Sequence, residues 1–274
     1  MLKHAFIIFA LFSLSFPRFA LAADAAPTVI GTVVEIEGKG TITIQGKMYQ
    51  AVRKSSVHMH DVIATGAKSK MLVLFADQTQ ITLSENAKLV VDEYVFNPKD
   101  NTDNAAEYSI TEGAFKYVSG FIAKKPDPVV SIKTAYGSIG IRGTTIQCGR
   151  VKDTYGVMVD EGRVRVRNDG GEVYVNKGKA TLIKSRREKP SPEGPPPEEF
   201  LKGLAFVLAF ADPTGVMGLL GNAQQDMNPE NFMKQFMQGG NPFKKGGSPL
   251  DNLKNKKKAG NPLDFIPKKG GFPF

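Results

Sequence analysis

The chain has 274 residues, of which 41% are hydrophobic and 23% charged, and its formal net charge is +9. This composition excludes a wholly disordered chain and predicts one or two domains. The single cysteine, Cys148, excludes an internal disulfide, so apolar packing must hold the core together. Cys148 is interpreted as a small buried hydrophobe rather than a nucleophile, because no histidine lies near it in the sequence.

Residues 1–22 are predicted to be a secretory signal peptide. Lys3 and His4 precede an apolar run from Ala5 to Phe16, and small residues end the segment at Ala20-Leu21-Ala22. The apolar run is shorter than the roughly 20 residues that span a bilayer, which favours export over an uncleaved anchor. The sequence therefore predicts a protein exported to a bacterial periplasm, with an uncleaved anchor as the alternative.

Residues 28–184 show β patterning almost without interruption. Apolar and polar residues alternate in short runs such as Thr41–Ile44 and Lys70–Phe75, and turn residues follow roughly every 8–12 residues. The clearest hairpin joins two alternating strands through Asn168-Asp169-Gly170-Gly171. We predict an all-β domain of short antiparallel strands, built as a sandwich or as a solenoid.

Arg163, Arg165 and Arg167 occupy alternate positions of one predicted strand, and valines fill the positions between them. The valines should face the core and the arginines the opposite side. A solvated strand face is the ordinary explanation for such charges, and an exported protein rarely meets nucleic acid. A face that binds an anionic polymer is the functional alternative.

The segment from Val129 to Ile146 has the most distinctive pattern in the chain. A strand-like run is followed by glycines at 137, 140 and 143 and then by a second β-branched run. Glycines this frequent disfavour a helix and indicate bulges, bends or close approach of another backbone. Arg142 lies inside this stretch, and we interpret it as a residue whose guanidinium holds the bend by hydrogen bonds.

The run Ile139-Gly140-Ile141-Arg142-Gly143-Thr144, with Thr134 before it, resembles the FecR-type domain, the periplasmic sensor domain of iron-citrate signalling. Upstream, Asp61-Val-Ile-Ala-Thr-Gly66 and the strand ending at Asp77 resemble the opening half of that family. His60 and Gln78 stand where the family has glycines, which indicates adjusted turns. The resemblance covers about residues 28–184. The motif positions that it marks as structural or interaction residues are Asp61, Thr65, Gly66, Asp77, Thr134, Gly140, Arg142, Gly143, Thr144 and Gly162.

The sequence changes character after the β region. Residues 185–198 form a charged, proline-rich linker, and residues 199–238 can hold short helices that dock on the β domain or on a partner. Peripheral contact with a membrane is a weaker alternative, because the apolar side lacks basic flanks. Residues 239–274 are rich in Lys, Gly, Pro and Asn, and we predict that this tail is disordered.

No motif in the sequence indicates catalysis. His58 and His60 could share a metal, but no convincing third ligand accompanies them, and no cofactor fingerprint or small-molecule site is recognisable. The resemblance implies a non-catalytic binding, scaffold or signalling module that contacts a protein partner or an anionic envelope polymer. Classical members carry an amino-terminal cytoplasmic segment and a membrane helix that this sequence does not show, so direct control of a sigma factor is not expected. The alternatives are a component of a transporter signalling system and a polysaccharide hydrolase that would use Asp61, Asp77 and Asp92.

Overall fold

The computed structural model describes residues 28–100, 102–124, 127–208 and 230. The predicted signal peptide (1–22), the tail (239–274) and nearly all of the segment 209–238 lie outside the described residues. Within the described residues, no helix has the length and apolar character needed to cross a membrane.

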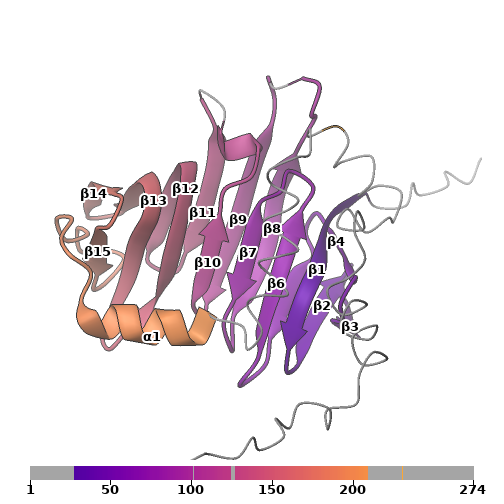
Figure 1. The fold of residues 1–274 in the computed structure, drawn as a ribbon, viewed down its shortest axis with the longest axis horizontal. Helices are drawn as coiled ribbons and strands as arrows, with labels where there is room; N and C mark the ends of the chain where they lie inside the picture. Colours follow the sequence, from indigo (N-terminus) through magenta and orange to yellow (C-terminus); the bar gives the residue numbers. More distant parts are fainter. Residues whose placement is uncertain (1–27, 101, 125–126, 209–229, 231–274) are drawn as a thin grey trace, which may run out of the picture.

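The described chain is built almost entirely from strands, which confirms the all-β prediction (Figure 1). One 3₁₀ turn, η1 (Ile122–Lys124), and one helix, α1 (Glu198–Leu208), complete it. The strands are β1 (Val29–Glu37), β2 (Gly40–Ile44), β3 (Lys47–Gln50), β4 (Ser56–His58), β5 (Val62–Thr65), β6 (Lys70–Phe75), β7 (Gln80–Leu83), β8 (Lys88–Val95), β9 (Ala105–Glu112), β10 (Phe115–Val118), β11 (Val129–Thr134), β12 (Gly137–Val151), β13 (Thr154–Asn168), β14 (Gly171–Asn176) and β15 (Ala180–Ile183).

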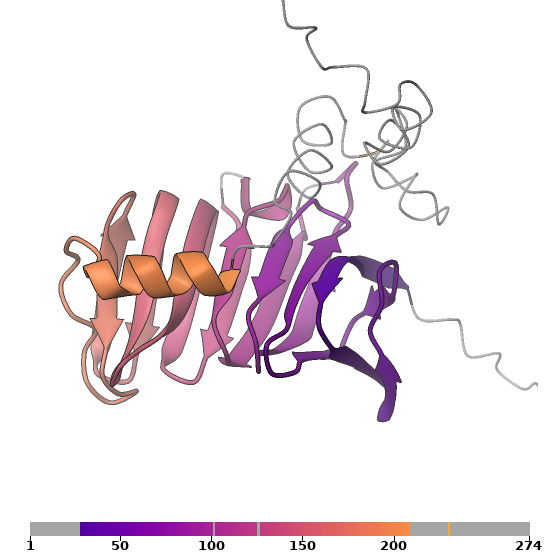
Figure 2. The same cartoon turned by 60° about the horizontal axis from the view of Figure 1, so that its bottom comes forward.

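The strands form one curled sheet that is folded into two facing layers (Figures 1 and 2). The first layer has the order β3-β2-β5-β8-β9-β11, and the second has the order β4-β1-β6-β7-β10. Strand β12 pairs with β11 of the first layer and with β10 of the second, so it joins them. Successive strands pass back and forth between the layers, which combines features of the two predicted alternatives, a sandwich and a solenoid.

Strands β12 and β13 are 15 residues long and cross from one layer to the other together. Their register shifts between Arg142 and Thr145, at the corner. Gly143 and Gly162 have φ values of +61° and +82°, and a Cβ on Gly162 would lie 2.5 Å from the Gly143 carbonyl oxygen. Only glycine fits such a close, left-handed position. The predicted glycine bend is therefore confirmed at Gly143.

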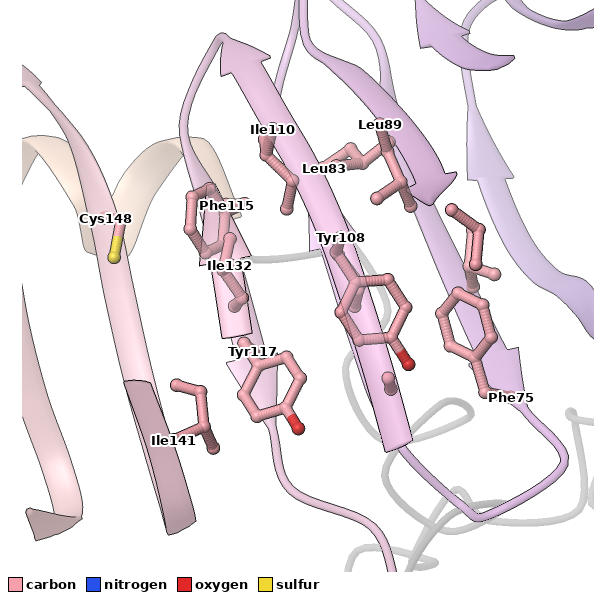
Figure 3. Close-up of a cluster of buried hydrophobic side chains, with 14 of the residues drawn as sticks. Phe75, Leu83, Leu89, Tyr108, Ile110, Phe115, Tyr117, Ile132, Ile141 and Cys148 are labelled. Carbon is pink, nitrogen blue, oxygen red and sulfur yellow. The ribbon is translucent and has the colours of Figure 1, made fainter. Parts of the chain in front are cut away.

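The core lies between the two layers and is largely aliphatic with an aromatic centre. The rings of Phe75, Tyr108 and Tyr117 lie next to one another there (Figure 3). The ring centroids of Phe75 and Tyr108 are 5.1 Å apart, a favourable tilted arrangement. Cys148 is fully buried in the same cluster, as predicted for a small hydrophobe.

Two features of the sheet differ from the expectation of short antiparallel strands. Strands β9 and β11 pair in parallel, and β12 and β13 are long. The parallel pair arises because β10 intervenes in the other layer, so the chain returns to the first layer in its original direction. The predicted hairpin through Asn168 and Gly171 is confirmed, since β13 and β14 pair directly across it.

Helix α1 packs on the outer side of the second layer, where Phe200 and Leu204 are buried (Figure 2). The preceding segment, 185–198, is fastened to β15. Gly194 and Ala180 exchange backbone hydrogen bonds of 2.9 and 3.0 Å, and the Thr181 hydroxyl donates to the Ser191 carbonyl at 2.7 Å. These bonds order the proline-rich residues along the sheet edge.

Candidate functional site

Three of the motif residues from the opening half stabilise turns. The Asp61 carboxylate is buried and accepts hydrogen bonds from the His58 backbone N–H at 2.8 Å and the His58 ring at 3.0 Å. The Thr65 hydroxyl donates to the Ser84 carbonyl at 2.5 Å and accepts from the Ala87 N–H at 2.9 Å. Gly66 donates its N–H to the Lys39 carbonyl. These residues connect neighbouring strands rather than facing an open site.

Asp77 is the most deeply buried acid of the motif. Its carboxylate accepts hydrogen bonds from the Thr79 N–H (3.0 Å), the Thr79 hydroxyl (2.7 Å), the Tyr94 hydroxyl (3.1 Å) and the Ile122 N–H (3.3 Å). Burial raises the pKa of Asp77 above its ordinary value, although these donors act in the opposite direction. The side chain therefore ties the β6–β7 turn to β8 and η1.

The two residues expected to replace family glycines adopt glycine-like backbone angles. His60 has φ = +66° and Gln78 has φ = +67°. These turns keep the left-handed conformation that favours glycine and accommodate a side chain in it. The two turns therefore differ from the family pattern in their residue type but keep the backbone conformation that glycine would adopt.

The threonines of the signature run also support corners. The Thr134 hydroxyl donates to the Gly137 carbonyl at 2.9 Å and accepts from the Tyr136 N–H at 3.2 Å, which closes the β11–β12 turn. The Thr144 backbone N–H donates to the Ser119 hydroxyl at 2.8 Å. Together with Gly143 and Gly162, these contacts fix where the long strands bend.

The acids and histidines that suggested other chemistry do not form a reactive constellation. Asp61 and Asp77 are buried and hydrogen bonded, and the Asp92 carboxylate accepts a 2.6 Å bond from the Ser109 hydroxyl. Among the described residues, no group of three or more His, Cys, Asp or Glu side chains could hold a metal ion.

The arginine stripe takes the predicted orientation. Arg163, Arg165 and Arg167 are exposed, whereas Val164 and Val166 between them are buried in the core. This alternation places the three guanidinium groups on the outer side of the first layer.

Pairing of β12, β13 and β14 extends the stripe into a face. Arg142 lies directly opposite Arg163, and Gly140 lies opposite Arg165. On the other side of β13, Arg165 lies opposite Tyr174. We call Gly140, Arg142, Arg163, Arg165, Arg167 and Tyr174 the arginine face.

The four arginines of this face have no hydrogen-bonded carboxylate among the described residues. The Arg163 guanidinium lies over the Tyr174 ring, 4.3 Å from its centroid. Arg142 was expected to hold the bend, but it is exposed and makes no hydrogen bond to the described part of the chain. The reason is its position in β12, which turns the side chain outward beside Arg163.

Gly140 does not have the role that its place among the three glycines suggested. A Cβ there would meet only the Arg165 carbonyl oxygen at 3.8 Å and the Arg165 Cβ at 3.9 Å, which are ordinary contacts. The interpretation of a bend or close approach is therefore wrong for Gly140. Because Gly140 has no side chain, the backbone is accessible at this point of the arginine face, between Ser131 of β11 and Arg165 of β13.

One residue of the face, Tyr174, and one relation, the opposition of Arg142 and Arg163, were not found from the sequence. Tyr174 alternates with valines on β14, which could have indicated an outward position, but its place beside Arg163 depends on the pairing of two strands. The opposition of Arg142 and Arg163 depends on a register that shifts at the corner, so sequence spacing carries no signal for it.

Comparison with known proteins gives one family match. Residues 61–165 match the family model described as FecR protein. Nothing among the curated proteins matches the chain. Two crystal structures of a candidate anti-sigma factor from Parabacteroides distasonis ATCC 8503 are similar at low identity. The first has 10% identity and a TM-score of 0.41 and covers 52% of this chain and 62% of its own. The second has 11% identity and a TM-score of 0.43 and covers 60% and 73%.

The family match begins at Asp61 and ends at Arg165, so it includes the buried Asp77, the glycine corner and most of the arginine face. Strands β1 and β4, at one edge of the second layer, precede the matched residues in the chain. Residues 61–165 of this chain are therefore similar to the FecR protein family.

Proposed function

We propose that this chain is a non-catalytic signalling component of the bacterial periplasm, and that its FecR domain binds an acidic protein surface through the arginine face. The predicted signal peptide supports the location. The family supports a signalling role, and the buried, hydrogen-bonded state of Asp61 and Asp77 supports a binding function over hydrolysis.

The observation that carries the proposal is the opposition of Arg142 and Arg163. Like charges directly across a strand pair destabilise a sheet. No carboxylate of the described chain forms an ion pair with either residue, and the Glu193 carboxylate, which interacts electrostatically with Arg163, is hydrogen bonded to Asn176 instead. A partner that supplies carboxylates would relieve the repulsion and gain forked hydrogen bonds from the guanidinium groups.

The composition of the face favours a protein partner over a polymer. Arginine and tyrosine are the residues enriched at protein interfaces, whereas lysine is depleted there. The cations on this face are all arginines, Tyr174 is 45% exposed, and Gly140 leaves room for a partner's backbone. An anionic envelope polymer remains the alternative to be separated by experiment.

The test is affinity capture from periplasmic extract with the exported chain and with a variant that carries Arg163→Glu, Arg165→Glu and Arg167→Glu. We expect the native chain to retain a protein whose binding weakens with salt, and the variant to bind it about tenfold more weakly or less. The matched control carries Lys39→Glu, Lys47→Glu and Arg150→Glu, which changes the same charge at exposed sites away from the face.

Equal capture by the native chain and the arginine variant would contradict the proposal. Capture of a polysaccharide or lipid in place of a protein, with the same sensitivity to the arginine changes, would assign the face to an anionic polymer. Loss of binding in both charge variants would show that only net charge matters.

A further inference from the structure

Acidic residues lie beside the arginine face, on the same outer side of the first layer. Glu93 of β8 is exposed and lies directly opposite Glu107 of β9. The Asp92 carboxylate is on this side as well, because it accepts its hydrogen bond from the hydroxyl of Ser109, whose neighbours in β9 are buried in the core. We call Asp92, Glu93 and Glu107 the acidic face.

One row of paired residues joins the two faces. Glu93 pairs with Glu107, which pairs with Ser131, then Gly140 and then Arg165. Paired residues present their side chains on the same side of a sheet, so the row runs from the acids to the arginines across the outer side. Glu93 and Arg165 are four strands apart, which corresponds to about 19 Å. Because this distance exceeds the screening length of about 8 Å at physiological ionic strength, the two charges gain little from each other within one chain.

Each face brings like charges together. Residues of the same charge directly opposite each other destabilise a strand pair, and this occurs at Glu93 and Glu107 as well as at Arg142 and Arg163. Glu107 forms an ion pair with Lys133 of β11. No ion pair among the described residues includes Glu93 or the arginines of the arginine face. Both faces would therefore gain from contact with the opposite charge.

Strand β11 lies midway between the two faces (Figure 1). Strand β8 is two strands away on one side, and β13 is two strands away on the other. A twofold axis that runs parallel to β11 above the outer side therefore places β8 of a second copy over β13 and keeps each residue in its row. Glu93 of the second copy then lies over Arg165, and Glu107 lies over Gly140, which has no side chain to obstruct it.

We propose that the acidic surface bound by the arginine face belongs to a second copy of this chain, in a twofold-symmetric dimer formed through the outer sides of the first layers. The inference rests on the proposed function, since it names the partner of the arginine face. Symmetry makes each contact twice, so Glu93 of each copy pairs with Arg165 of the other. Val129 of β11 is 65% exposed and lies at the axis, where its own copy covers it.

The equal spacing of acids and arginines about β11 favours a second copy over an unrelated acidic protein. An unrelated partner would need the arginines alone, whereas a twofold dimer needs an acid and an arginine in the same row and at the same distance from the axis. Glu93 and Arg165 meet both conditions. The protein retained in the capture experiment should therefore be the chain itself.

The test measures the mass of the full exported chain in solution by sedimentation equilibrium at physiological ionic strength. The native chain should form a dimer that dissociates as salt is added. Glu93→Arg alone, or Arg165→Glu alone, places like charges across both contacts and should raise the dissociation constant at least about tenfold. The control, Glu198→Arg, reverses an exposed acid on α1 and should leave the dimer unchanged.

Exchange of the two charges separates this pairing from a general effect of charge. A chain that carries both Glu93→Arg and Arg165→Glu should dimerise more tightly than either single variant. An equimolar mixture of the two single variants should do the same, because each contact then joins opposite charges. A monomeric native chain, a dimer that Glu93→Arg leaves intact, or an exchange that restores no affinity would overturn the inference.

Failure of this inference can be told apart from failure of the proposed function. If the native chain is monomeric but captures a different protein that the triple arginine variant does not, the arginine face binds a partner and only the second copy is wrong. If the triple arginine variant captures as much protein as the native chain, the arginine face itself is not the binding surface.

Discussion

The Phe200 ring of α1 packs directly against the backbone of Gly156 in β13, in the space that a side chain at position 156 would occupy. A Cβ on Gly156 would lie 2.0 Å from Cε2 of Phe200, which no packed structure allows. Gly149 lies directly opposite Gly156 in the β12–β13 pair, and a Cβ there would lie 2.9 Å from the Leu204 side chain. The paired glycines form the seat that fixes α1 on the second layer.

We predict that Gly156→Ala destabilises the protein by about 1–3 kcal/mol, because the added methyl group displaces the Phe200 ring. Urea unfolding measures the change. The control, Gly194→Ala, adds a methyl group where no atom lies within 4 Å and should change the free energy of unfolding little. In a Phe200→Ala background the effect of Gly156→Ala should shrink. An undiminished effect in that background would show that the ring is not what the methyl group meets.

The buried Asp77 predicts a particular dependence of stability on pH. Burial raises its pKa in the folded state above the ordinary value of 3.8. The folded protein therefore holds the proton more tightly than the unfolded chain. The resulting stabilisation is fully present below pH 3.8 and is lost as pH rises through the folded-state value.

Asp77→Asn removes this titration. The free energy of unfolding of the native protein, relative to that of the variant, should thus increase as pH falls from 7 toward 4. Urea unfolding at a series of pH values measures the difference, and the other carboxylates cancel in it. A relative stability that instead decreases on acidification would mean that the hydrogen bonds to Asp77 outweigh its burial.

Cys148 should be unreactive in the folded protein. It is fully buried, and burial raises the pKa of its thiol well above the ordinary value of 9.0. A thiolate-specific reagent at pH 8 should therefore label it only after urea unfolding. Ser138→Cys, half-buried on the outer side of β12, provides a control that should react in the folded state. Rapid reaction at Cys148 without denaturant would contradict the packing of the core.

His60→Gly should stabilise the protein by about 0.5–1 kcal/mol. The residue is exposed, with φ = +66°, and glycine removes the strain of a side chain in that conformation. Glycine also gives the unfolded chain more conformational entropy, but this cost is smaller than the strain that is removed. Thermal or urea unfolding gives the value. Met59→Gly, at the adjacent exposed residue without positive φ, should have the opposite sign. Destabilisation by both changes would show that the His60 side chain makes a contribution larger than its strain.

Much of the fold follows from local rules that the sequence displays. Alternation at Arg163–Arg167 predicts which side of β13 faces the core, because side chains of a strand alternate whatever its neighbours are. The glycine at 143 predicts a corner because a left-handed backbone is strained for residues that carry a side chain. His60 and Gln78 show that a turn can keep its left-handed backbone angle when another residue stands where the family has glycine.

The remaining features depend on which strands meet. The parallel pairing of β9 with β11 follows from the passage of β10 through the other layer, and the opposition of Arg142 and Arg163 follows from a register shift at the corner. Neither relation is local in sequence. The same holds for the contact between Phe200 and Gly156, which lie more than 40 residues apart in the chain.

The most direct test of the account is site-specific photocrosslinking from the arginine face in the periplasm of living cells. A benzoylphenylalanine at Ser138, beside Arg167 in the β12–β13 pair, should give one protein adduct of defined mass. The adduct should disappear when Arg163, Arg165 and Arg167 are changed to glutamate and persist when Lys39, Lys47 and Arg150 are changed. An adduct that survives the arginine changes, or one formed equally from a probe at Lys47, would contradict the assignment of this face as the binding surface.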